Sequence, residues 1–170
     1  MEKLLQSVHQ SLKRLTGLHC QLLELVREEK THLLSADLAK IGAVSKAKLA
    51  LCEEIHQVEY NRLKCIDELA MVLKKPVQSL KLHELILSIQ TSHPELAASL
   101  QSSLNALTHL VSRISEQNAD NQLLLQQALS HVQVMKKNAI SEASMKSSTY
   151  THQGNRSQGV QASHLISREI

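Results

Sequence analysis

The side chains that could perform chemistry include ten histidines and one short motif that contains a histidine. His83 and Glu84 begin like the zinc-binding pattern HExxH, but Leu87 occupies the place of its second histidine. The other histidines are scattered over every segment, and none pairs with a cysteine or carboxylate at a spacing that suits metal ligation. This pattern favours histidines on helix surfaces, solvated or partly buried, over a metal site.

The three cysteines give no sign of redox or nucleophilic chemistry. Cys20, Cys52 and Cys65 are odd in number and widely spaced, which argues against a disulfide framework and is typical of a reducing cytoplasm. Cys52 and Cys65 fall on apolar faces, so we expect them to be small core residues. We therefore expect no catalytic, cofactor-binding or metal-binding residue and no enzyme. A metal-dependent enzyme is the alternative, which metal analysis of the purified protein could exclude.

The composition indicates an all-α protein. The chain has no Trp, no Phe and only two Tyr, so aliphatic residues must form its core, which suits helices packed through leucine. The net charge of +3 forms no basic stripe and base-stacking aromatics are missing, so no nucleic-acid partner is expected. No apolar run reaches about 18 residues and the start lacks a signal-peptide core, so we expect a cytoplasmic protein that does not span a membrane.

The spacing of apolar residues predicts four helices, at about 4–34, 37–74, 79–90 and 93–140. In the first helix they recur every three or four residues, and Glu29 occupies one position of that pattern. Ser35 and Asp37 mark a turn, Pro76 ends the second helix, and Ser92 is the expected cap of the fourth. We expect an elongated antiparallel bundle or coiled coil over residues 1–140 and a flexible tail over 141–170.

Two asparagines interrupt the apolar stripe of the fourth helix. Its pattern extends on both sides of them, at Leu100, Leu104, Leu107, Val111, Ile114, Leu125, Ala128, Val132, Met135 and Ala139. Asn118 and Asn121 fall on the same stripe, where an unsatisfied amide would cost about 1–3 kcal/mol. We expect them to bond each other, Glu59 or Arg62 of the second helix, or water. They either form a structural polar layer that fixes the register or contact a partner directly.

Apolar residues flank this stripe in the second half of the fourth helix. Leu124 and Leu129 lie beside the stripe, whereas Leu123 and Val134 point away from it. Leu123 and Val134 are eleven residues apart, about three turns, and so share one face of the helix. An outward apolar pair is a candidate docking patch, although isolated apolar residues are also common on protein surfaces.

The arrangement of these elements resembles the FlgN-type flagellar export chaperones over about residues 1–150. The shared pattern is a Leu-rich first helix, the turn LLSADLAKI, a second helix with KAKLALCEEIHQVEYNRL, and a connector containing proline. A long last helix follows with the N-x-x-N core NADNQLLLQQALSHV, and then a tyrosine in the Ser-rich segment STYTHQG. The N-x-x-N-x-x-LL element and the tyrosine after it are the most specific part of the resemblance.

The resemblance implies a cytoplasmic chaperone that captures C-terminal segments of hook–filament junction proteins. It would prevent their early assembly and bring them to the flagellar type III export gate. The implied binding residues lie in the second half of the last helix, with Tyr150 for docking to the export machinery. The tail SQGVQASHLISREI is longer than in the simplest members. A self-associating coiled coil, hence a homo-oligomer, and a cytoplasmic adaptor without a secreted client are the alternatives.

Overall fold

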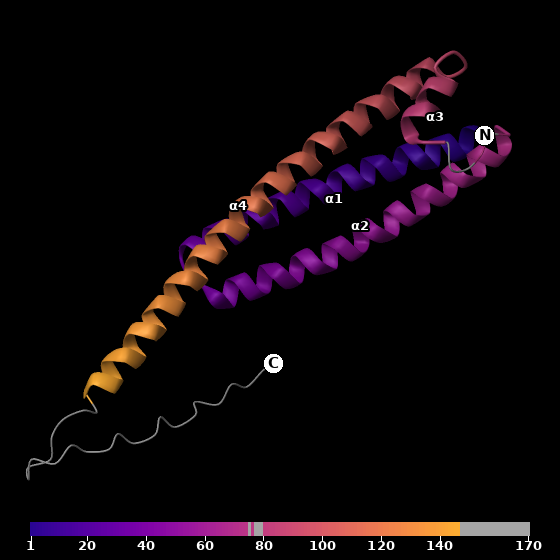
Figure 1. Ribbon diagram of the computed structural model, residues 1–170. Coiled ribbons are helices and arrows are strands. Elements are labelled where there is room, and N and C mark those ends of the chain that lie inside the picture. The colour runs from indigo at the N-terminus through magenta and orange to yellow at the C-terminus, as the bar shows by residue number, and fades with distance from the viewer. Residues whose placement is uncertain (75, 77–79, 147–170) are drawn as a thin grey trace, which may run out of the picture. The chain divides into compact units, whose positions relative to one another are not determined.

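The structure is a computed structural model that describes residues 1–74, 76 and 80–146. This part of the chain contains no strand and four helices (Figure 1). They are α1 (Glu2–Leu34), α2 (Leu38–Val72), α3 (Leu82–Ile89) and α4 (Pro94–Lys146). The expected all-α class, with three long helices and one short helix, is therefore confirmed.

The helix ends differ from the expected ends by a few residues. The short helix α3 begins three residues later than expected, and α4 continues to Lys146, so residues 141–146 of the expected tail are helical. Ser92 does not cap α4. Its hydroxyl donates to the carbonyl of Ile89 at 3.3 Å, and the first helical hydrogen bond of α4 is accepted by His93. Residues 147–170, the remainder of the expected tail, lie outside the described residues.

The chain divides into two compact units within α4, at Leu124 and Leu125, whereas the expected boundary was at residues 140 and 141. The first unit holds α1, α2, α3 and the first part of α4. The described part of the second unit, up to Lys146, is the rest of α4.

The main core of the first unit lies where all four helices meet. The apolar stripe of α1 packs there against the last turns of α2, against α3 and against the start of α4. The side chains buried in this cluster are Leu5, Val8, Leu12, Leu15, Ile66, Leu69, Ala70, Leu80, Leu85, Ile86, Ile89, Ala97 and Leu100. Leu85, Ile86 and Ile89 form one face of α3, as their spacing predicts.

A second, smaller cluster joins α4 to the hairpin formed by α1 and α2, whose helices lie side by side (Figure 1). Ile114 of α4 is buried there against α1, with Leu51 and Leu110 packed at its edge. The α1 members of this cluster are Leu22, Leu23 and Val26. Because burying one such side chain contributes about 1.5–3 kcal/mol, this cluster holds the middle of α4 on the hairpin.

The turn between α1 and α2 is closed by a helix-ending motif and a helix cap. Asp37 donates its N–H to the His32 carbonyl and Ala36 donates to that of Leu33, while Ala36 adopts a left-handed φ of 54°. The carboxylate of Asp37 then accepts the N–H of Lys40 at 3.2 Å and caps α2. This hydrogen bond lowers the pKa of Asp37. The cap is therefore complete at neutral pH and weakens as the pH falls through that lowered pKa.

Ala36 should be improved by glycine, because a left-handed φ costs an L-residue about 1 kcal/mol and costs glycine nothing. We expect Ala36→Gly to raise the free energy of unfolding in urea by about 0.5–1 kcal/mol. The matched control is Ala43→Gly at an exposed position inside α2, which should lower it by about 1 kcal/mol. Destabilisation by both variants would mean that the turn does not hold this conformation in solution.

The middle of α2 is more exposed than its apolar pattern suggests. Cys52 is exposed, as is Leu49 nearby, so the expectation that Cys52 lies in the core is wrong. Leu51 and Ile55, one turn apart, instead face the second cluster and are half-buried. In its middle, α2 therefore packs against the second cluster with only one row of side chains, the row that contains Leu51 and Ile55.

Candidate partner-binding surface

The second unit presents an uncovered apolar stretch. Every residue from Leu125 to Ser141 is exposed, and the stretch continues the three-and-four spacing that is buried at Leu100 and Ile114. Its large exposed apolar side chains are Leu125, Leu129, Val132, Val134, Met135 and Ile140. Because monomeric proteins seldom leave a continuous apolar helix face in water, such a stretch marks a place for a partner.

The five expected binding residues differ in how exposed they are. Leu123, Leu129 and Val134 are 58%, 54% and 57% exposed, so all three are accessible. Leu124 is half-buried at the end of the first unit. Tyr150 lies outside the described residues.

Both asparagines of the stripe belong to a polar cluster that joins three helices. Asn121, only 4% exposed, donates from Nδ2 to the carbonyl of Val26 and to Oε2 of Glu29, both at 2.9 Å. The same Glu29 oxygen accepts from Nζ of Lys48 in α2 at 2.7 Å. Lys48 also lies 3.4 Å from Oδ1 of Asn118. Glu29 therefore bridges α2 and α4 from its position on α1.

An ion pair extends the cluster on its exposed side, where Nζ of Lys30 lies 3.0 Å from Oδ2 of Asp120. The expected partners Glu59 and Arg62 do not take part, because Arg62 bonds Glu59 within α2. They lie about three turns further along α2 than Lys48, the residue that faces Asn118.

The cluster leaves one buried acceptor without a hydrogen bond. Among the described residues, Oδ1 of Asn121 has no hydrogen-bond partner, nor has Oε1 of Gln117 one turn earlier on α4. A buried acceptor that stays unpaired costs about 1–3 kcal/mol. Leucine at position 121 would pack without that penalty but would donate no hydrogen bond to Glu29.

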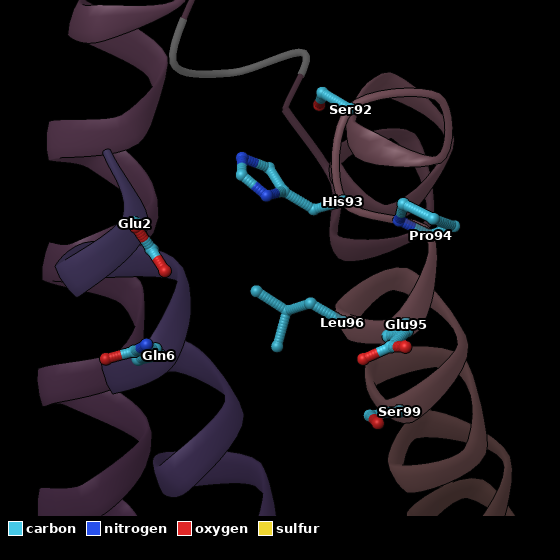
Figure 2. Close-up of a pocket in the computed structure, with 8 residues that line it drawn as sticks. All are labelled: Glu2, Gln6, Ser92, His93, Pro94, Glu95, Leu96 and Ser99. Atoms are coloured by element: carbon cyan, nitrogen blue, oxygen red, sulfur yellow. The ribbon is translucent and has the colours of Figure 1, made fainter.

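A pocket of about 490 Å³ lies at the start of α4, away from the polar cluster (Figure 2). His93, Pro94 and Leu96 line it from α4 and the preceding turn, and Glu2 and Gln6 line it from α1. The carboxylates of Glu2 and Glu95 make it unsuitable for an anion. No group of three or more possible metal ligands occurs in the described part of the chain.

The fold and this surface define a helical bundle with an uncovered apolar helix face, and no described helix is long and apolar enough to cross a membrane. A family model described as FlgN protein matches residues 1–158. The chain therefore belongs to the FlgN family of flagellar export chaperones. No curated protein and no solved structure matches it significantly.

Proposed function

We propose that this protein captures the C-terminal segments of hook–filament junction proteins in the cytoplasm, prevents their early assembly and delivers them to the flagellar type III export gate. It would act by binding alone, without catalysis or a cofactor. The uncovered apolar face of α4 after Leu124 carries the proposal, because a binding protein needs an accessible apolar surface on a folded scaffold. Membership of the FlgN family supports the class of client.

The exposed residues of α4 fit an amphipathic helix as the client. Apolar residues at helical spacing bind a partner helix through its own apolar face. Leu123, Leu129 and Val134 would supply contacts, with half-buried Leu124 at the edge of the scaffold. A client segment that folds on binding loses conformational entropy, which keeps its affinity moderate and permits release. An export chaperone needs such reversible binding.

We assign Asn118 and Asn121 to a structural polar layer that fixes where α4 rests on the hairpin. Asn121 supports this role, because its amide bonds the backbone and a carboxylate of α1 and is too buried to contact a partner. Asn118 is exposed, and its one hydrogen bond in the described residues, to Lys48, is long at 3.4 Å. We assign Tyr150 to docking at the export gate, on the family resemblance alone.

Charge substitutions at Leu123 and Val134, two exposed apolar residues that share one face of α4, test client binding. We expect Leu123→Asp and Val134→Asp each to weaken the binding of client C-terminal peptides by tenfold or more, measured by calorimetric titration. Their effect on the free energy of unfolding should stay within about 0.5 kcal/mol, because both side chains are exposed.

The matched control is Leu49→Asp, which introduces the same charge at an exposed leucine of α2. It should leave client binding unchanged. If all three variants bind client as the unmodified chain does, the site is not on the face of α4 that Leu123 and Val134 share. If Leu123→Asp or Val134→Asp unfolds the protein, that residue belongs to the core and not to a docking surface.

A further inference from the structure

A second uncovered apolar surface lies between α1 and α2. It is a groove of about 540 Å³, and its apolar lining consists of Leu25 of α1 and of Ala47, Ala50 and Leu51 of α2. The carboxylates of Glu24 and Glu54 stand among its lining residues. Its described lining contains no residue of α3 or α4. The hairpin thus has one side covered by α4 and another that holds an open groove.

A groove between two antiparallel helices is the position that a further helix occupies in a four-helix bundle. Together with the α4 segment around Ile114, a helix in this groove would complete such a bundle. The small side chains of Ala47 and Ala50 would allow it to approach closely. The lining residues span about two turns of α2, from Ala47 to Glu54, and about one turn of α1, from Gln21 to Leu25. The α2 side therefore sets the length of the occupant.

The uncovered stretch of α4 matches this length and pattern. Leu125, Leu129, Val132 and Lys136 are spaced four, three and four residues apart and so lie on one face. The three apolar members span about two turns, as the α2 side of the groove does. All four side chains are exposed.

The charges of the two surfaces are complementary. The sequence from Leu125 to Ser141 contains Lys136 and Lys137 but no acidic residue, whereas both charged side chains lining the groove are glutamates. Glu24 and Glu54 already pair with Arg27 and Arg14 on exposed surface. Since exposed pairs contribute little, a lysine can join or replace them at small cost.

We propose that the uncovered face of α4 from one copy docks in the α1–α2 groove of a second copy, and that the second copy does the same in return. Two equivalent contacts close the assembly as a symmetric dimer. The dimer covers both apolar surfaces of each chain when no client is bound. Because Leu129 belongs both to the docking face and to the proposed client contacts, client binding and dimerisation compete for it; this last point rests on the proposed function, but the dimer itself does not.

Analytical ultracentrifugation of the full chain without client tests the dimer. We expect a monomer–dimer equilibrium, and we expect Ala50→Glu in the groove and Val132→Glu on α4 each to raise the dissociation constant by tenfold or more. An equimolar mixture of the two variants should form heterodimers. One groove and one α4 face remain intact in such a pair, so one of its two contacts survives.

Two control variants carry the same new charge at exposed positions outside the proposed contact. Ser130→Glu lies on the opposite face of α4 from the docking face, and Ala106→Glu lies on α4 within the first unit. Both should dimerise like the unmodified chain. A monomer at all concentrations up to about 100 µM overturns the proposal. A dimer that Val132→Glu breaks and Ala50→Glu leaves intact also overturns it, because α4 would then pair with α4. Normal client binding by a strictly monomeric chain would reject the dimer and leave the proposed function standing.

Discussion

Replacing Glu29 by alanine is expected to lower the free energy of unfolding by about 2–3 kcal/mol, because two donors lose their shared acceptor. Its carboxylate accepts from Lys48 and Asn121, and the side chains of Glu29 and Lys48 are only 15% and 22% exposed. Without Glu29, the partly buried ammonium group of Lys48 loses its carboxylate partner. Removing one partner of such a pair costs more free energy than the pair itself contributes. Urea unfolding followed by circular dichroism measures the loss.

The neighbouring residue provides the control. Glu28 is exposed, and Glu28→Ala should change the stability by less than about 0.5 kcal/mol. Hydrogen exchange adds a local readout, because amides of α4 around Asn121 should exchange faster in Glu29→Ala than in Glu28→Ala. Equal stability of both variants would show that the cluster does not hold α4 on the hairpin.

The second large effect on stability is expected at Leu100 but not at Leu129, although both lie on α4. Leu100 is fully buried in the main core, and Leu100→Ala is expected to lower the free energy of unfolding by about 3–5 kcal/mol through lost burial and the cavity it leaves. Leu129 is 54% exposed, and Leu129→Ala should change stability by less than about 0.5 kcal/mol.

The affinity for client should respond to the same two substitutions in the opposite way. We expect Leu129→Ala to weaken the binding of a client C-terminal peptide several-fold. Leu100→Ala, at a temperature where it is still folded, should bind normally. If Leu129→Ala costs as much stability as Leu100→Ala, the end of α4 is packed in solution and is not an open surface.

The spacing of apolar residues predicted the helices well, because the buried face of each helix is visible in its own sequence. The stripe of α1 and the face of α3 follow directly from three-and-four periodicity. In α2 Cys52 follows the three-residue spacing to Ile55, yet Cys52 is exposed, whereas Ile55 and Leu51 pack on the second cluster. Which row is covered depends on the neighbouring helices, and single-helix periodicity does not contain that information.

The sequence predicted some members of the polar cluster but not that they contact one another. Asn118 and Asn121 stood out as amides on an apolar stripe, and Glu29 occupied an apolar position of the first helix. Lys48 gives a similar signal, because it lies between Val44 and Leu51 at the spacing of a buried row. Charged or amide residues on the stripes of three helices could have been matched as one layer. Only the structure shows that these four residues meet. The sequence does not reveal which turns of two separate helices lie beside each other.

The exposure of α4 after Leu124 has a consequence for the lifetime of the protein in the cell. The side chains from Leu125 to Ser141 are exposed and so gain little from packing. A helix segment of this kind opens often, and proteases cut opened segments. When cleavage is slow compared with opening and closing, degradation follows the population of the open form. A client or a second copy that covers the segment lowers that population. The steady-state amount of this chain is then expected to follow the supply of its binding partners, so that unloaded copies are removed first.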